Sequence, residues 1–113
     1  MAVLYWYNRL MIKVGILGAT GYMGGEALRV LLEHPKIKIA WATSRAPDDI
    51  AAFHPNLYGS RVKLISPDKI TPCDVIFFAL PSGLPMQMAE KLLKTDHKLI
   101  DLGADFRLKD VKL

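Results

Sequence analysis

The chain has 113 residues, of which 51% are hydrophobic and 23% are charged, a composition typical of one compact folded domain and not of a disordered segment. Its formal net charge of +4 comes from basic residues scattered along the chain, so we expect no nucleic-acid-binding surface. A single cysteine excludes an internal disulfide framework and a cysteine-based zinc cluster, and no apolar run reaches the roughly 18 residues of a membrane span. The cytoplasm is therefore the expected location, without a membrane partner.

The first residues form an unusual segment. Val3 to Tyr7 is apolar, but Asn8 and Arg9 interrupt it, and the segment lacks the basic start and small-residue cleavage site of a signal peptide. We expect residues 1–11 to be an extension ahead of the domain, with Met11 as the natural first residue. The domain itself is expected to span residues 12–113.

From residue 12 onward, short apolar runs rich in branched residues alternate with stretches of helical spacing. This alternation is typical of an α/β protein with a parallel sheet. Strands are predicted at Ile12–Leu17 and Ile37–Thr43, with a helix between them that ends before Pro35. The core-facing stripe of this helix is predicted to be Met23, Ala27, Leu28, Leu31 and Leu32.

The second part of the chain begins less regularly. Residues 44–60 are polar and show little periodicity, which indicates a loop with room for one helical turn. Further strands are predicted at Val62–Ile65, Val75–Ala79 and Lys98–Leu102, with a helical turn at Pro67–Ile70 and a helix at Pro85–Lys94. Right-handed crossovers would wind this order into a Rossmann-type, doubly wound and mainly parallel sheet. Because the chain ends soon after a strand, we expect the sheet to be truncated and the chain to be part of a longer protein.

A glycine-rich loop separates the first predicted strand from the helix. Its spacing, Gly18-x-x-Gly21-x-x-Gly24, is a variant of the dinucleotide fingerprint in the strand–loop–helix context that the fingerprint requires. Gly18 permits the tight turn, Gly21 lets the backbone approach a pyrophosphate, and Gly24 allows close packing of helix on strand. The helix N-terminus offers free N–H groups to the phosphates. We predict a dinucleotide site here; the alternative is a glycine turn used only for packing.

The end of the second predicted strand indicates which dinucleotide binds. NAD sites usually place Asp or Glu about 20 residues after the loop, where the carboxylate binds the ribose 2′-hydroxyl. This chain has Ser44 and Arg45 instead, and a planar guanidinium suits a 2′-phosphate. We therefore predict NADP as the cofactor; the alternative is an ordinary exposed arginine in a loop.

Two further loops follow predicted strands, and such loops line the ligand crevice of open α/β sheets. The segment Leu80 to Gly83 either forms a wall beside the nicotinamide or is a plain helix-start turn. Asp105 and Arg107 either orient a substrate or form a structural ion pair, and their chemistry alone favours the ion pair. No catalytic or metal-binding residue is predicted in the chain. The predicted cofactor-binding residues are Gly18, Ala19, Thr20, Gly21, Tyr22, Met23, Ser44, Arg45, Leu80, Pro81 and Ser82.

Five segments between Ile12 and Asp110, in order and at compatible spacings, carry a family resemblance. They are Gly18-Ala19-Thr20-Gly21-Tyr22, Thr43-Ser44-Arg45, His54-Pro55-Asn56-Leu57, Leu80-Pro81-Ser82-Gly83 and the run from Asp101 to Asp110. Together they resemble the N-acetyl-γ-glutamyl-phosphate reductase family of arginine biosynthesis. The glycine loop alone also fits aspartate-semialdehyde dehydrogenases, and reductases of carrier-protein-bound aminoadipyl or glutamyl phosphate in lysine biosynthesis share these motifs. The family usually has Ser where Gly103 stands and often His or Asn where Ser82 stands.

The resemblance implies a particular chemistry. In the family a cysteine thiolate displaces phosphate from an acyl phosphate, NADPH delivers hydride to the thioester, and the hemithioacetal collapses to an aldehyde. The family's cysteine, in an Asn-Pro-Gly-Cys segment, and its catalytic histidine would both lie beyond Leu113. The resemblance therefore implies an NADP-binding domain that is catalytically incomplete alone, with the acyl-phosphate substrate bound by an absent domain and a homo-oligomer possible. The alternative is a free-standing NADP-binding or sensing module.

Three other side chains have structural interpretations. Cys73 precedes a predicted strand at its amino end, opposite the expected crevice, so we interpret it as a small buried hydrophobe and not as a nucleophile. Trp41 is expected to pack in the core. His54 lies in a family motif, and either a local structural role or a cofactor contact fits it.

Overall fold

The computed structural model describes residues 11–45, 49–80, 89, 92 and 97–103. The predicted extension, apart from Met11, and the predicted helix at residues 85–94, apart from Ala89 and Leu92, lie outside these residues. The elements in chain order are strand β1 (Ile12–Leu17), helix α2 (Tyr22–Leu32), strand β2 (Ile37–Thr43), the 3-10 turns η1 (Ile50–Ala52) and η2 (Pro55–Leu57), strand β3 (Leu64–Ile65), the 3-10 turn η3 (Pro67–Lys69), and strands β4 (Val75–Phe78) and β5 (Lys98–Asp101).

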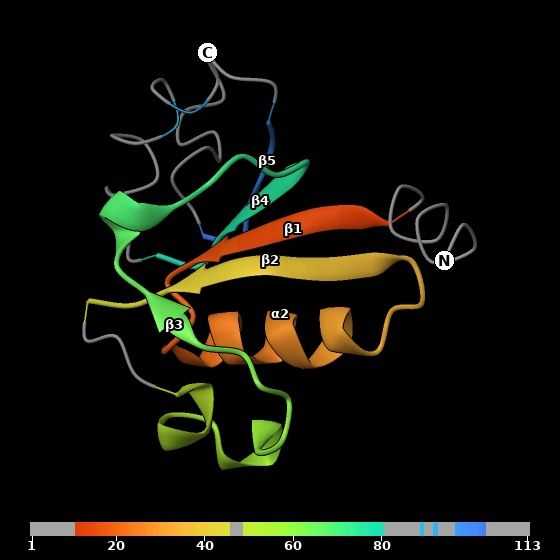
Figure 1. Ribbon diagram of the computed structural model, residues 1–113. Helices are drawn as coiled ribbons and strands as arrows, with labels where there is room; N and C mark the ends of the chain where they lie inside the picture. The colour runs from red at the N-terminus through yellow and green to blue at the C-terminus, as the bar shows by residue number, and fades with distance from the viewer. Residues whose placement is uncertain (1–10, 46–48, 81–88, 90–91, 93–96, 104–113) are drawn as a thin grey trace, which may run out of the picture.

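The five strands form one sheet in the order β3-β2-β1-β4-β5, and every neighbouring pair is parallel. The chain moves outward from β1 to β3, returns to the centre, and then moves outward again on the other side through β4 and β5 (Figure 1). This is the strand order of a doubly wound sheet, with its reversal point between β1 and β4. The predicted α/β fold class is confirmed.

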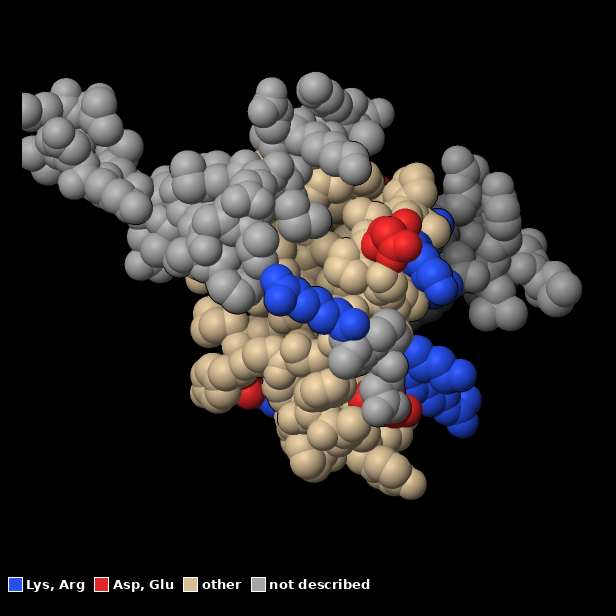
Figure 2. Space-filling view, turned by 90° about the vertical axis from the view of Figure 1, so that its left-hand side faces the viewer, with Lys and Arg blue, Asp and Glu red and all other residues tan. Residues whose placement is uncertain are grey.

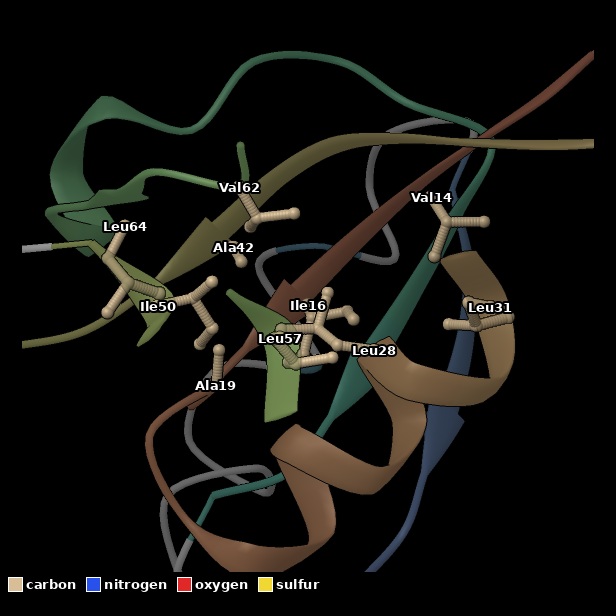
Figure 3. Packing of buried hydrophobic residues seen from close by; sticks show 10 residues of the cluster. All are labelled: Val14, Ile16, Ala19, Leu28, Leu31, Ala42, Ile50, Leu57, Val62 and Leu64. Atoms are coloured by element: carbon tan, nitrogen blue, oxygen red, sulfur yellow. The ribbon is translucent and has the colours of Figure 1, made fainter. Parts of the chain in front are cut away.

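Helix α2 covers one face of the sheet (Figure 1). Val14 and Ile16 of β1 point to this face because side chains alternate along a strand, and they pack against Leu28 and Leu31 of the helix. Figure 3 shows the crossover between β2 and β3 adding Ile50 and other apolar side chains to the same cluster. Burial of this cluster holds α2 and the crossover against the sheet.

The opposite face holds a second apolar cluster, which includes Leu17, Trp41 and Phe78, with Ala89 and Leu92 packed on it. The indole ring of Trp41 lies beside Gly15, where an added Cβ would stand 2.3 Å from a ring carbon. The strand register shifts between Val14 and Gly15, next to this contact. The indole N–H donates a hydrogen bond of 2.8 Å to the carbonyl of Thr71. The prediction that Trp41 packs in the core is confirmed.

The predicted apolar stripe of the helix is partly wrong. Leu28 and Leu31 are buried, but Met23 is 50% exposed and Leu32 is 37% exposed. The buried residues at the start of the helix are Gly24, which lies against the glycine loop, and Gly25, which lies against His54 of the crossover. A Cβ at position 24 would lie only 2.4 Å from the carbonyl oxygen of Gly18, so the helix approaches the loop too closely for a larger side chain.

The strand predictions hold with small differences at the ends. The bounds of β1 and β2 agree with the prediction, β4 and β5 each end one residue earlier, and β3 contains only the last two residues of its predicted range. The crossover of residues 44–60, predicted as a loop with room for one helical turn, contains the two 3-10 turns η1 and η2.

Candidate functional site

The glycine loop begins with a turn that only glycine adopts easily. Gly18 has φ of +85°, in the left-handed region. A Cβ at this position would also lie 2.6 Å from the carbonyl oxygen of Ala79, the residue that follows β4. Both the backbone angle and the space therefore require glycine, as the sequence predicted.

Thr43, the last residue of β2, holds this turn in place. Its Oγ1 accepts a hydrogen bond of 3.1 Å from Gly18 N–H, and its carbonyl accepts one of 3.0 Å from Ala19 N–H. The Thr43 side chain is 1% exposed, so water competes little for either bond. The loop that leaves β1 is thus attached to the end of the neighbouring strand.

The far side of the loop is open. Gly21 is the N-cap residue of α2, and a Cβ at this position would meet no described part of the chain beyond its two neighbours within 4 Å. Tyr22, the first helical residue, is 78% exposed. The first turn contains no acidic residue, and among the described residues no side chain caps it. The first N–H groups of the helix lack intrahelical partners by geometry, and phosphate groups are suitable acceptors for such N–H groups.

The residues predicted to recognise a 2′-phosphate lie directly after β2, on the same edge of the sheet. Ser44 is buried, and its N–H donates to the carbonyl of Ile65 at 3.0 Å, whereas Arg45 is exposed. Figure 2 views this edge, where the strands end, and basic side chains lie across its middle and along one side. Arg45 is therefore the better placed of the two for contact with a bound anion.

The crossover contributes a side chain to the loop. His54 Nε2 lies 2.9 Å from the carbonyl oxygen of Ala19. A Cβ at Gly25 would lie 2.3 Å from the imidazole ring, so the ring fills the space beside the first turn of α2. The sequence left two interpretations of His54 open, a local structural role and a cofactor contact. The contact with Ala19 is the one that the local structural role requires.

The ends of β4 and β5 also meet at this edge. Gly103 N–H donates to Asp101 Oδ1 at 2.9 Å, and a Cβ at Gly103 would lie 3.8 Å from the carbonyl oxygen of Leu80. Leu80 itself packs against the second apolar cluster. The other Asp101 oxygen, Oδ2, is buried and has no hydrogen-bond partner among the described residues. Of the residues predicted for these loops, Pro81, Ser82, Asp105 and Arg107 lie outside the described residues.

Two residues of this edge were not predicted as site residues. Thr43 was noted only as part of a motif, and Asp101 only as the start of another. Both end a strand on the carboxyl side, and that position was the available signal for them. Their roles depend on contacts with Gly18 and Gly103.

Cys73 is placed as expected, just ahead of β4 and so at the amino edge of the sheet. Burial, together with the charge of Asp74, raises the pKa of its thiol. Its Sγ donates to the carbonyl of Val75 at 3.5 Å, and its N–H donates to His97 Nε2 at 3.3 Å. A raised pKa disfavours the thiolate, which is the nucleophilic form. These observations favour the structural interpretation.

In the part of the chain that the structure describes, no three His, Cys, Asp or Glu side chains are grouped to hold a metal ion. No helix within those same ranges has the length and apolar character needed to cross a membrane.

Three features define a doubly wound α/β domain of the dinucleotide-binding class. They are the reversal of strand order beside β1, the glycine turn attached to Thr43 and the open first turn of α2. Comparison with known families agrees. The chain belongs to the semialdehyde dehydrogenase family through its NAD-binding domain, whose family model matches residues 13–112.

Curated relatives share more sequence identity with this chain than a common fold alone requires. The chain is 50% identical over 107 residues to N-acetyl-γ-glutamyl-phosphate reductase of Polynucleobacter asymbioticus, a match that covers 90% of this chain and 30% of that protein. It is 47% identical over 109 residues to the reductase of the same name from Desulforamulus reducens, covering 91% of this chain and 32% of the relative. The predicted resemblance is confirmed, and the chain spans about a third of the length of these relatives.

Two solved structures share the fold. Aspartate semialdehyde dehydrogenase with NADP from Candida albicans has a TM-score of 0.74 at 19% identity, over 88% of this chain and 31% of that one. Aspartate semialdehyde dehydrogenase II complexed with ASA from Vibrio cholerae has a TM-score of 0.67 at 19% identity, over 88% of this chain and 33% of that one. These likenesses support the doubly wound fold.

Proposed function

We propose that this chain is the NADP-binding domain of an N-acetyl-γ-glutamyl-phosphate reductase, an enzyme that reduces an acyl phosphate to a semialdehyde. The observation that carries the proposal is the open glycine loop at the carboxyl edge of the sheet, in a chain half identical to reductases of that name. The names of the relatives favour N-acetylglutamyl phosphate over the carrier-bound substrates of lysine biosynthesis.

The pyrophosphate of the cofactor is assigned to the glycine loop. Main-chain N–H groups donate well to phosphate oxygens, and the dipole of α2 adds partial positive charge at the same point. The open space beside Gly21 lets a phosphate approach the backbone without meeting a side chain. The loop residues assigned to this contact are Gly18, Ala19, Thr20, Gly21, Tyr22 and Met23.

The 2′-phosphate of NADP is assigned to Ser44 and Arg45. Arg45 is exposed directly after β2, and its guanidinium can donate two parallel hydrogen bonds to phosphate oxygens. Ser44 is buried, and its N–H bond to Ile65 orients the backbone that presents Arg45. A carboxylate, which would bind the 2′-hydroxyl of NAD, stands at neither position.

The nicotinamide end is assigned to the loops after β4 and β5. Leu80 and Gly103 approach one another there, and Pro81 and Ser82 follow in sequence. NADPH, when bound, supplies the hydride for the reduction. The role of this chain is to hold that donor and to present one face of its ring to a substrate.

The residues that act on the acyl phosphate are assigned to the two thirds of the relatives that this chain does not span. Cys73 is unsuited to the task, since its thiol pKa is raised and it stands at the amino edge of the sheet. We therefore expect no turnover by this chain alone. The binding domain is proposed to span residues 12–113, after an extension of residues 1–11, and to work in the cytoplasm as part of a biosynthetic enzyme.

A calorimetric titration tests the cofactor assignment. The purified chain is titrated with NADPH and separately with NADH, and we expect the affinity for NADPH to be at least about tenfold higher, as one charge-assisted contact predicts. Equal affinities would remove the 2′-phosphate assignment, and absence of binding to both would remove the dinucleotide site.

The reductase and the non-catalytic sensing module differ in the residues encoded after Leu113 in the parent reading frame. An Asn-Pro-Gly-Cys segment downstream supports the reductase, because it would supply the family's nucleophile. A stop codon at that point in every isolate would support the sensing module instead.

A further inference from the structure

His54 lies between the turns η1 and η2, and its imidazole reaches across to the glycine loop. Its Nε2 is 2.9 Å from the carbonyl oxygen of Ala19, which is 35 residues earlier in the chain. A carbonyl oxygen only accepts hydrogen bonds, so Nε2 carries the proton and donates. The bond therefore requires a proton on Nε2 and places no requirement on Nδ1.

The helix leaves room for this ring. The Cβ of any other residue at Gly25 would stand 2.3 Å from Cε1, 2.5 Å from Nδ1 and 2.6 Å from Nε2 of His54. Gly25 lies inside α2, so its backbone has no need of glycine. The space for the imidazole is therefore the reason that the structure gives for a glycine there.

The backbone of His54 is itself well supported. Its N–H donates to the carbonyl of Ile50 at 2.9 Å, and its carbonyl accepts from Leu57 N–H at 2.9 Å. Ile50 and Leu57 are both buried in the cluster that contains Ala19 (Figure 3). The imidazole thus projects from a part of the crossover that is anchored in the core.

The bond to Ala19 has a consequence for the next residue. In a trans peptide the C=O of one residue and the N–H of the next point in opposite directions. Because the Ala19 carbonyl points toward His54, the N–H of Thr20 points away from the crossover. Beyond Thr20, the loop faces the open space beside Gly21 and the exposed Tyr22.

We propose that His54 is a positioning residue for the dinucleotide site, because its imidazole fixes the Ala19–Thr20 peptide with the Thr20 N–H directed outward to a phosphate of the cofactor. The inference rests on the proposed function for the identity of the ligand. The orientation of the peptide rests only on the contacts of His54 with Ala19 and Gly25.

Two substitutions separate the donated hydrogen bond from the volume of the ring. His54→Leu fills a similar space without a donor, whereas His54→Gln keeps an N–H donor at a comparable reach. His34→Leu is the matched control, because His34 also bonds to the backbone, through Nδ1 to Lys36 N–H at 3.1 Å, but beyond the other end of α2.

The first measurement is the dissociation constant for NADPH, and the second is amide hydrogen exchange without cofactor. Exchange is followed at Gly18 and Ala19, whose N–H groups bond to Thr43, with Ile76 in β4 as the reference for global opening. We expect His54→Leu to weaken NADPH binding about tenfold and to speed exchange in the loop about tenfold relative to Ile76. For His54→Gln and His34→Leu, the dissociation constant for NADPH and the exchange rates in the loop should stay within about twofold of those of the unchanged chain.

Unchanged binding and unchanged loop exchange in His54→Leu would overturn the proposal. So would a His54→Gln variant as impaired as His54→Leu, because ring volume and not the donated bond would then matter. Equal acceleration at Ile76 and in the loop would also overturn it, since the role would be general stability. If the unchanged chain binds no NADPH, the proposed function fails, and the exchange measurements still decide whether His54 fixes the loop.

Discussion

Thr43 Oγ1 accepts the N–H of Gly18 across 3.1 Å, so the last residue of β2 holds the turn that leaves β1. This bond attaches the loop that follows β1 to the end of β2, at the carboxyl edge where ligands of open α/β sheets bind. The hydroxyl is buried, and removing it would leave the Gly18 N–H in a place with little access to water.

Thr43→Val should therefore lower both stability and affinity for NADPH. The side chain keeps its shape but loses the acceptor, and a buried donor without a partner costs about 1–3 kcal/mol. Thermal unfolding and NADPH titration measure the two effects. Thr43→Ser retains the hydroxyl and serves as the control; a Ser variant with the full defect of Val would contradict the assignment to Oγ1.

Arg45→Ala should narrow the preference for NADPH over NADH. Loss of a charge-assisted hydrogen bond costs about 1.5–3 kcal/mol, so NADPH affinity should fall about tenfold to a hundredfold while NADH affinity stays within about twofold. Arg29→Ala removes the same charge from the exposed pair with Glu26 and should change neither affinity. If both variants lose NADPH affinity equally, the effect is one of net charge and not of a 2′-phosphate contact.

Gly25→Ala should destabilise the chain even though alanine favours helices. The added methyl group would overlap the His54 ring, and overpacking of this kind costs about 1–3 kcal/mol. In the background of His54→Ala the same change should become neutral or stabilising by up to about 1 kcal/mol, because the ring is gone and helix propensity remains. Chemical denaturation of the unchanged chain, the two single variants and the double variant gives the coupling free energy between Gly25 and His54. Equal costs in both backgrounds would mean that the ring does not occupy this space.

Cys73 should react slowly with alkylating reagents in the folded chain. Burial raises the pKa of its thiol above the ordinary value of 9.0, so less thiolate is present at pH 8 than in the unfolded chain. The folded state holds the thiol proton more tightly, and this contributes stability that is present below about pH 9 and is lost as the pH rises through the folded pKa.

Two measurements check the thiol prediction. Iodoacetamide should label the native chain more slowly than the urea-unfolded chain at pH 8. The stability advantage of the unchanged chain over Cys73→Ala should shrink between pH 8 and pH 11. Faster labelling of the folded chain would contradict the raised pKa and reopen a nucleophilic role.

The sequence was most informative where apolar runs are long and bounded. The bounds of β1 and β2 could be read directly, since branched residues recur along both strands and Gly18 and Ser44 follow them. The carboxyl edge and the glycine loop then followed from the order of the elements.

The contacts that shape the loop could not be read in the same way. The turns η1 and η2 are too short to show a period, and η1 begins where Asp49 Oδ1 accepts from Ala51 N–H, a local bond that many sequences can make. His54 reaches a partner 35 residues away, which periodicity does not detect. At the start of α2, Gly24 is buried against Gly18 while Met23 is half exposed, and the approach of Gly24 to Gly18 exists only in the folded chain.

The fit of Trp41 beside Gly15 has a consequence for how the chain reaches its fold. The contact lies next to the register shift between Val14 and Gly15, so indole and glycine together admit one alignment of β1 with β2. A slip of one residue would turn each side chain of β2 to the opposite face and take the Thr43 hydroxyl away from Gly18. The packing of an aromatic ring in the interior thereby favours the strand alignment on which the glycine turn depends. It does so before any ligand is present.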